Sequence, residues 1–344
     1  MKFLTMIFAS LALASVAAAA PVIPKTMKAM AIDGPGGPEV LVLHTLPVPD
    51  VDANEVLIAV YSAGVAIWDT QIRDSLVFIR KPKFPYVLGS DGAGKVAAVG
   101  SAVKRFKTGD AVYAYCWDNP KGGFYAEYVA VPSDCVAKLP KGISLQSAGA
   151  LGASGLTALS GVDRALGIKR GDKVIIHGAS GAVGTLAVQL AKLRGARVLA
   201  TASGDEGIAL VKRLGADAVV DGRNGDIGAA ARAFAPDGVD AVLALAGGAA
   251  LEKCVDALRS GGRVAFPNGV EPVPQPREGL TIIPFDALFG DQKVQFEQLN
   301  KAIEARHFDV PIAGTFSLED AAAAHRRIAA GHLAGKVVLE IRKP

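Results

Sequence analysis

The chain has 344 residues, enough for two domains with a substantial core. Hydrophobic residues make up 51% and charged residues 20%, which excludes a disordered protein. The net charge is +4 with no basic block, so nothing indicates a nucleic-acid partner. The three cysteines, Cys116, Cys135 and Cys254, are widely spaced and predict neither a disulfide framework nor a metal site.

Residues 1–20 have the features of a secretory signal peptide. Met1-Lys2 is a short basic start, residues 3–16 are apolar, and residues 17–20 are four alanines that suit a cleavage site. The apolar run is too short to favour a stable membrane span. We therefore expect a periplasmic or secreted protein. Translation from Met27 would instead leave the protein in the cytoplasm.

Short strands and turns follow in the first half of the chain. Alternating or β-branched runs bounded by Gly and Pro predict strands at residues 27–32, 40–44, 55–62, 95–99, 111–114 and 127–132. Little helix is expected in this region. It is interpreted as a β-rich domain.

From about residue 148 the pattern changes to alternating helices and strands. Strands are predicted at residues 174–177, 197–201, 218–220, 241–245, 263–266 and 281–283, with helices at 154–165, 185–193, 207–214, 226–234 and 250–258. This alternation predicts an α/β fold with a doubly wound parallel sheet. The last segment should contain helices at 294–305 and 318–330 and a strand at 336–341.

The most informative motif is a glycine-rich turn between a predicted strand and a predicted helix, made of Gly178, Ala179, Ser180, Gly181, Ala182, Val183 and Gly184. Gly178 permits a tight turn, Gly181 lets the backbone approach a pyrophosphate, and Gly184 lets helix and strand pack closely. The free N–H groups at the helix start favour phosphate. The motif therefore predicts a dinucleotide-binding Rossmann domain, because both flanking elements are present.

The residues after the second and third strands favour NADPH over NADH. Enzymes that use NAD place an acid about 20 residues after the glycines, where it holds the ribose 2′-OH. Here that position, 203 − 184 = 19 residues after Gly184, is Ser203. Arg223 could pair with a 2′-phosphate, although it could also be a surface charge. Asp205 and Glu206 nearby weaken this interpretation slightly.

Several segments together resemble a known family. They are Gly64-Val65 followed by Asp69 and Arg73, Gly89-Ser90-Asp91, Phe124-Tyr125-Ala126-Glu127-Tyr128-Val129, Gly155-Leu156-Thr157-Ala158, the glycine turn, and Gly335-Lys336-Val337-Val338-Leu339. From about residue 27 to the C-terminus the chain is similar to the medium-chain dehydrogenase/reductase superfamily, in its zinc-free NADPH quinone oxidoreductase-like (zeta-crystallin-like) branch. The resemblance implies a GroES-like catalytic domain at 27–149, rejoined by 291–344, and a Rossmann domain at 150–290.

The resemblance also bears on zinc. Zinc-dependent members carry Cys, His and Cys where this chain has Ala66, Ser90 and Ala153, and these side chains cannot form the usual catalytic zinc site. We therefore expect no zinc. Without a Lewis acid the substrate must accept hydride readily, as quinones and alkenes conjugated to a carbonyl do.

Further contacts follow from the family by position. Thr157 would approach the nicotinamide, unless it is only a hydroxyl on the side of its helix. Ribose and carboxamide contacts are expected at the ends of two later strands, at Leu245, Ala246, Pro267, Asn268 and Gly269.

On the substrate side, Trp68 could stack on a flat substrate or could be a packed core indole. Tyr125 could donate to the reduced oxygen, although packing in the barrel is the alternative. Asp69 and Arg73 are expected to pair with each other. His177 is expected to be satisfied by backbone groups.

The leading hypothesis is hydride transfer from NADPH to a quinone. The close alternative is reduction of the C=C bond of an enone or alkenal, because Ala66 and Gln71 stand where quinone reductases often have Asn and Tyr. A hypothesis of another class is a nucleotide-binding redox sensor or structural protein with little turnover. A homodimer is expected by analogy with the family alone.

Overall fold

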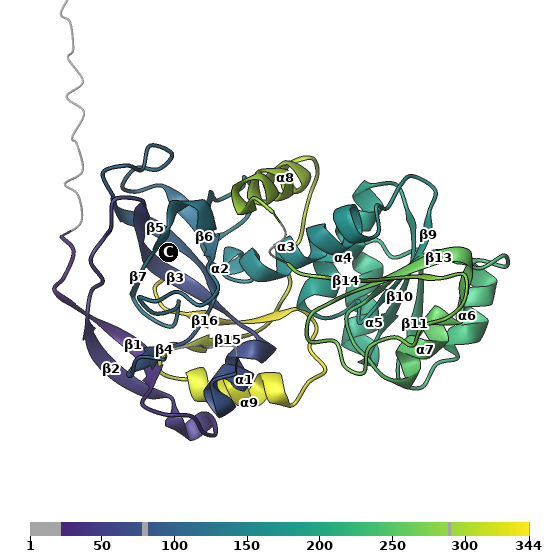
Figure 1. Ribbon diagram of the computed structural model, residues 1–344, viewed down its shortest axis with the longest axis horizontal. Helices are drawn as coiled ribbons and strands as arrows, with labels where there is room; N and C mark the ends of the chain where they lie inside the picture. The colour runs from purple at the N-terminus through teal and green to yellow at the C-terminus, as the bar shows by residue number, and fades with distance from the viewer. Residues whose placement is uncertain (1–21, 78–81, 288–289, 344) are drawn as a thin grey trace, which may run out of the picture.

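The structure is a computed structural model that describes residues 22–77, 82–287 and 290–343. The predicted signal peptide at residues 1–20 lies outside the described residues. A β-rich domain and an α/β domain lie side by side along the long axis of the molecule (Figure 1). No helix among the described residues is long and apolar enough to cross a membrane.

The α/β domain is built on six parallel strands in the order β11-β10-β9-β12-β13-β14. In chain order they are β9 (Lys173–His177), β10 (Arg197–Ala202), β11 (Ala218–Asp221), β12 (Val239–Ala244), β13 (Leu258–Pro267) and β14 (Thr281–Phe285). The strand order reverses next to β9, which makes the sheet a doubly wound Rossmann sheet and confirms the predicted fold class.

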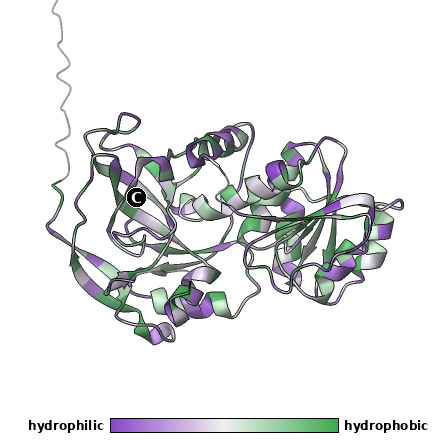
Figure 2. Cartoon of the chain, in the orientation of Figure 1, coloured by the Kyte–Doolittle hydropathy of each residue, from purple (hydrophilic) through white to green (hydrophobic). Residues whose placement is uncertain are grey.

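Helices cover both faces of this sheet. They are α3 (Gly152–Leu159) with the π-helical turn η3 (Ser160–Ala165), α4 (Ala182–Leu193), α5 (Gly204–Arg213), α6 (Ile227–Phe234) and α7 (Ala249–Val255). Alternate residues of β9 point to opposite faces, so Val174 and Ile176 join one buried cluster and Ile175 joins the other. This double burial explains the hydrophobic colour of the central parallel strands β9, β10 and β12 (Figure 2).

The β-rich domain contains a seven-stranded sheet in the order β15-β16-β3-β5-β6-β8, with β7 paired to β3, and a three-stranded sheet β2-β1-β4. The strands are β1 (Thr26–Ile32), β2 (Val42–Pro47), β3 (Glu55–Val65), β4 (Tyr86–Val87), β5 (Asp91–Val99), β6 (Ala111–Tyr115), β7 (Tyr128–Pro132), β8 (Val136–Lys138), β15 (Ile312–Ser317) and β16 (Lys336–Glu340). Because β16 pairs with β3, the end of the chain returns to this domain. The exact domain boundaries remain a prediction.

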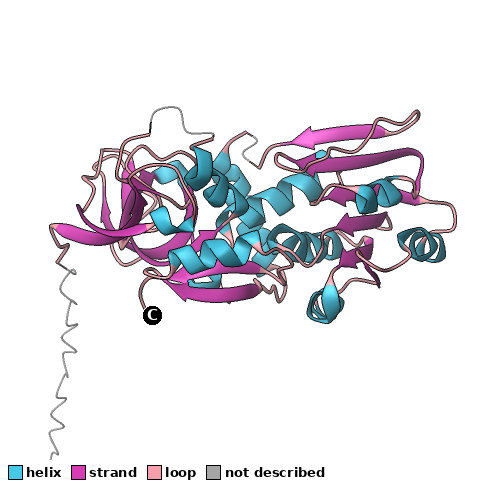
Figure 3. Ribbon diagram, turned by 90° about the horizontal axis from the view of Figure 1, so that it is seen from below, coloured by secondary structure: helices cyan, strands magenta, loops and turns pink. Residues whose placement is uncertain are grey.

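Several elements differ from the sequence-based expectation. Helix α1 (Ile67–Ser75) lies where little helix was expected, and short helix α2 (Leu145–Ala148) precedes α3. Strands β4, β8 and β15 were not expected at all. Helix α9 (Ala321–Ala329) packs against α1, as the two views of the β-rich domain show (Figures 1 and 3). Helix α1 is therefore stabilised by tertiary contacts as well as by the hydrogen bond from the Ala66 amide to Asp69 at its start.

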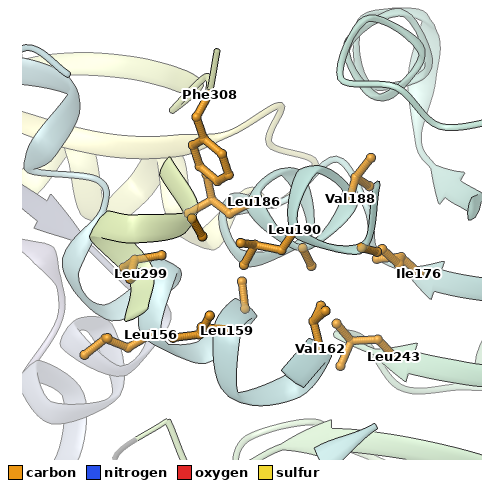
Figure 4. Close-up of a cluster of buried hydrophobic side chains, with 14 of the residues drawn as sticks. Leu156, Leu159, Val162, Ile176, Leu186, Val188, Leu190, Leu243, Leu299 and Phe308 are labelled. Atoms are coloured by element: carbon orange, nitrogen blue, oxygen red, sulfur yellow. The ribbon is translucent and has the colours of Figure 1, made fainter. Parts of the chain in front are cut away.

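A single buried cluster joins the two domains. Leu156 of α3 and Leu186 and Leu190 of α4 pack beside Leu299 of α8 (Gln292–Glu304) (Figure 4). From the β-rich domain, Tyr113 belongs to the same cluster, and its ring meets the ring of Phe296 edge-on at 5.1 Å. One apolar cluster therefore spans both domains, and each domain has a further cluster of its own.

Candidate functional site

The glycine turn lies between β9 and α4, where the sequence predicts it. Gly178 has φ +79°, a conformation that other residues rarely adopt. A methyl group added at Gly184 would lie 2.6 Å from the Cα atom of Ala179 and would also collide with the carbonyl of Gly178. Only glycine at position 184 allows α4 to begin this close to β9.

Gly181 differs from Gly184 because the protein does not crowd it. A methyl group there would meet only the carbonyl oxygen of Gly178, at 3.5 Å. The amide of Thr185 donates to the carbonyl of Gly181 at 3.0 Å, so the amides of the first turn of α4 precede the helical hydrogen bonds. The turn thus presents backbone donors, the positive helix end and an open side at one point. This arrangement fits a dinucleotide pyrophosphate.

The predicted contacts of the cofactor's adenosine end lie at neighbouring strand ends. Ser203 follows β10 and precedes α5, and Arg223 follows β11. The amide of Gly222 donates to the carbonyl of Ala202 at 2.8 Å, which holds these two strand ends together. Arg223 is exposed, and among the described residues its side chain has no ion-pair partner. Ser203 and Arg223 thus lie at neighbouring strand ends, and their contact with a cofactor stays a prediction.

The other predicted cofactor residues lie on the same edge of the sheet, because parallel strands end together. The amide of Leu245 donates to the carbonyl of His177 at 3.0 Å, which places Leu245 and Ala246 beside the glycine turn. Pro267 ends β13, and Asn268 and Gly269 follow it as exposed residues.

Thr157 is buried in α3, and its hydroxyl donates to the carbonyl of Ala153 at 2.8 Å. Its oxygen can still accept a hydrogen bond.

His177 differs from the prediction that backbone groups satisfy it. Its Nδ1 lies 2.8 Å from the hydroxyl of Thr201 and 3.7 Å from the sulfur of Cys254. The same hydroxyl accepts the amide of Gly178 at 3.1 Å. Burial lowers the pKa of His177 to about 4, so the imidazole is neutral at pH 7. His177 therefore supports the glycine turn through the Thr201 hydroxyl, which bonds both its imidazole and the amide of Gly178.

The three positions where zinc-dependent members of the family carry ligands make hydrogen bonds within the protein. The indole Nε1 of Trp68 donates to the hydroxyl of Ser90 at 2.9 Å. The amides of Ala66 and Ala153 donate to carboxylates, at 2.8 Å to Asp69 and 3.1 Å to Asp91. Methyl, hydroxyl and methyl side chains do not fit a catalytic zinc ion.

The two tryptophans of the chain meet beside these positions. Their rings are 6.1 Å apart between centroids in an edge-on arrangement, with Trp68 on α1 and Trp117 just after β6. The amine of Lys336 lies 5.4 Å from the centre of the Trp68 ring. Trp68 is therefore neither a fully packed core indole nor a free surface residue.

Lys336 has a buried, charged environment in this region that the sequence alone did not predict. It is 4% exposed and lies 3.6 Å from the carboxylate of Asp91, which is fully buried. Asp91 Oδ1 has no hydrogen-bond partner among the described residues. A lone lysine at the head of the apolar strand Val337-Val338-Leu339 was the available signal, because a buried lysine is rare unless it is paired.

The glycine turn and Lys336 are joined directly. The amide of Gly335 donates to the carbonyl of Ser180 at 2.9 Å, and Gly181 forms a parallel bridge with Gly335. Lys336 is the next residue, and its amine lies against the ring of Trp68. Gly335 and Lys336 therefore connect the glycine turn to the aromatic wall formed by Trp68 and Trp117.

Tyr125 is not placed for contact with a substrate. Its side chain is fully buried, and its hydroxyl lies 3.3 Å from Asp69 Oδ2 and 3.1 Å from His325 Nε2. The structure thus favours the packing alternative for Tyr125. The expected pair of Asp69 with Arg73 is also wrong, because Arg73 binds Asp74 and, at 3.0 Å, Nδ1 of His325.

Asp69 is the other residue whose importance emerges only in three dimensions. Burial raises the pKa of its carboxyl to about 7, against the opposing effect of the Ala66 amide and of Lys336. The neighbouring His325 is neutral, because burial first and Arg73 second lower its pKa to about 3. Asp69 can therefore carry a proton near neutral pH.

A pocket opens beside Asp69 in the β-rich domain. The space it leaves free is about 20 Å³, and it is lined by Asp69, Ile72, Tyr86, Val87, Leu88, Gly89, Ser90, Cys116, Trp117, Asp118, Asn119 and Gly123. A tryptophan, a hydroxyl and a protonatable carboxyl in its wall suit the polar oxygens of a small ligand.

Two family models match the chain. Residues 52–141 match the alcohol dehydrogenase GroES-like domain, and residues 214–339 match a family described as zinc-binding dehydrogenase. The second match does not extend to the zinc positions Ala66, Ser90 and Ala153.

Relatives match along almost the whole chain. A quinone oxidoreductase of Lama guanicoe is 34% identical over 330 residues, which covers 92% of this chain and 98% of the relative. The NADPH-dependent alkenal/one oxidoreductase of Arabidopsis thaliana chloroplasts is 33% identical over 326 residues, covering 92% of this chain and 80% of the relative.

Solved structures agree with the fold. The quinone oxidoreductase of Coxiella burnetii superposes with a TM-score of 0.79 at 30% identity, covering 92% of this chain and all of the other. An NAD-dependent alcohol dehydrogenase superposes with a TM-score of 0.82 at 31% identity and the same coverage.

Proposed function

The chain belongs to the quinone oxidoreductase-like branch of the medium-chain dehydrogenase/reductase superfamily, and we propose that it transfers hydride from NADPH to a quinone without zinc. One observation carries the proposal. The hydrogen bond between Gly335 and Ser180 ties the phosphate-binding turn to β16, and the next residue, Lys336, lies against Trp68. The cofactor turn and the aromatic wall are thus adjacent.

The cofactor would be NADPH. When bound, it supplies the hydride. Gly178 to Gly184 would hold its pyrophosphate, and Arg223 would pair with its 2′-phosphate because no carboxylate stands at Ser203. The plant relative is named NADPH-dependent and the alcohol dehydrogenase NAD-dependent. The proposed preference for NADPH over NADH therefore depends on this chain's own Ser203 and Arg223.

The residues of the pocket would orient the substrate and stabilise charge. Trp117 lines the pocket, with the ring of Trp68 edge-on to it. The Ser90 hydroxyl, which already accepts from Trp68, can donate to a substrate oxygen. The buried cation of Lys336 favours negative charge that develops in its vicinity. Asp69 would give up the proton that the reduced oxygen needs, since its carboxyl is protonated up to about pH 7.

The absence of zinc is part of the proposal. Ala66, Ser90 and Ala153 offer one hydroxyl between them, which is not a zinc ligand set. Among the described residues no group of three or more His, Cys, Asp or Glu could hold a metal ion. Charge stabilisation would therefore fall to Lys336, Ser90 and Asp69.

Reduction of an enone or alkenal is the second candidate. It is favoured by the plant relative and by Ala66 and Gln71, which replace the Asn and Tyr common in quinone reductases. The third hypothesis, a binding protein with little turnover, is less favoured, because the curated relatives are named as oxidoreductases.

A steady-state panel tests the function. NADPH and NADH are each combined with 1,4-benzoquinone and with an alkyl enone, NADP⁺ and NAD⁺ are each combined with a primary alcohol, and cofactor oxidation or reduction is followed by absorbance. We expect the highest kcat/KM with NADPH and the quinone. Faster turnover of the enone would make the enzyme a C=C reductase, and negligible turnover of every substrate would overturn both proposals.

We also propose that the protein is exported by residues 1–20. Mass spectrometry of the natural N-terminus decides this: a mature chain that starts at Ala20 supports export, whereas a start at Met27 contradicts it. The homodimer expected from the family remains a prediction.

A further inference from the structure

The structure brings together two cysteines that the sequence separates. Cys116 directly follows β6, and Cys135 ends the short turn η2 (Ser133–Cys135) that leads into β8. Strands β6 and β8 pair with Ala114 opposite Val136, so both cysteines lie at the same end of this ladder. Cys116 belongs to a buried cluster against which Cys135 packs, and each thiol shifts the pKa of the other. The wide spacing of the cysteines along the chain therefore does not separate these two thiols in the fold.

The two thiols differ in environment in the way that thiol–disulfide exchange requires. Cys135 is half-buried, and the hydrogen bond from Cys116 lowers its pKa. Cys116 is 7% exposed, and its pKa is raised by the hydrogen bond to Cys135 and by burial. One sulfur is reachable and more easily ionised, and the other lies behind it. The third cysteine, Cys254, is fully buried against His177.

We infer that Cys116 and Cys135 form a redox pair that closes to a disulfide by exchange with a small-molecule disulfide such as oxidised glutathione. The Cys135 thiolate attacks one sulfur of the small disulfide, whose S–S bond breaks and releases one thiolate. Cys116 then loses its proton to that thiolate and attacks the Cys135 sulfur, which expels the second thiolate. Two protein thiols are oxidised by two electrons, and the small disulfide is reduced to two thiols.

The pair lies in the wall of the pocket. Cys116 lines the pocket, and its amide donates to the carbonyl of Ser90 at 2.8 Å. The next residue, Trp117, meets Trp68. A disulfide would tie this wall to η2 and would change the shape of the pocket while leaving the glycine turn untouched.

Peptide mapping of the full chain tests the chemistry without any measurement of activity. The reduced protein is incubated with oxidised glutathione, alkylated and digested under non-reducing conditions. We expect a Cys116–Cys135 linked peptide that dithiothreitol removes, with Cys254 alkylated only after unfolding. Absence of the linked peptide, or a link that involves Cys254, overturns the inference.

Two variants test the order of attack. Cys116→Ser keeps the reachable thiol but removes the resolving one, so it should accumulate a stable glutathione adduct at Cys135. Cys135→Ser should remain unmodified at Cys116. The reverse pattern contradicts the assignment of Cys135 as the attacking thiol.

The link to the pocket has its own readout in the wild-type protein. Oxidation should raise the KM for the quinone and leave the Kd for NADPH unchanged, and dithiothreitol should restore the original KM. If the disulfide forms while the quinone KM stays the same, the pair is a redox site without influence on the pocket.

Discussion

The glycine turn and the proposed substrate pocket recognise their ligands with different groups. The turn offers backbone amides and depends on glycines at 178, 181 and 184, whereas the pocket wall offers side chains from α1, from β4 and the residues after it, and from the residues after β6. Backbone recognition leaves a local pattern in the sequence. Side-chain recognition depends on distant segments that the fold brings together, so it leaves almost none.

Gly184→Ala should have the largest effect, because it tests whether the turn is built from backbone alone. The added methyl would lie 2.6 Å from Ala179 Cα. We expect the free energy of unfolding to fall by about 1–3 kcal/mol, with a lower Tm and weaker NADPH binding. Thermal denaturation with and without NADPH measures both quantities.

Gly181→Ala is the matched control for Gly184→Ala. Its methyl has ordinary contact distance to the protein, so the Tm should stay unchanged while the Kd for NADPH rises. A variant that binds NADPH as tightly as the wild type would show that position 181 does not face the pyrophosphate.

Asp69→Asn should have the next largest effect and tests whether the pocket supplies the proton. The Asn oxygen can still accept the Ala66 amide, so α1 should remain capped. We expect kcat with the quinone to fall about 10²-fold below pH 7. The wild type should lose activity as the pH rises through about 7, and the variant should not. An unchanged pH profile would assign the proton to water.

The same carboxyl makes stability depend on pH. Burial raises the folded-state pKa of Asp69 from 3.8 to about 7, so the folded state binds more protons than the unfolded state between these values. Its contribution to stability must therefore fall as the pH rises from about 4 to about 7. The difference in free energy of unfolding between Asp69→Asn and wild type, from denaturant titrations at pH 5 and pH 8, should shift in favour of the variant at pH 8.

Arg223→Ala should have a smaller effect, confined to the cofactor side. Because Arg223 is exposed, its pair with a 2′-phosphate is screened, and we expect the KM for NADPH to rise roughly two- to fivefold. The KM for NADH should stay the same, which provides the internal control. Equal changes for both cofactors would remove Arg223 from the 2′-phosphate site.

A metal chelator should have the smallest effect. Dialysis against EDTA is expected to leave quinone reduction unchanged, since Ala66, Ser90 and Ala153 offer no zinc ligand set. Loss of activity that zinc restores would contradict the zinc-free proposal.

Much of the α/β domain was predictable because its signals are local. The strand–turn–helix at residues 173–193 and the later alternation of strands and helices along the chain follow from periodicity over short windows. Helix α1 was not predictable in this way, because it depends on Asp69 at its start and on packing against α9. Lys336, Asp69 and the Cys116–Cys135 pair acquire their environments only when β16, α1, β6 and η2 meet, and no spacing in the sequence reports those meetings.

The shared core around Tyr113, Leu156 and Phe296 has a consequence for how the molecule comes apart. Separation of the domains would expose apolar surface on α3, α8 and β6 at once. Neither domain can therefore lose its structure while the other keeps its full core. Unfolding should be cooperative across the whole chain, with one calorimetric transition for both domains instead of two.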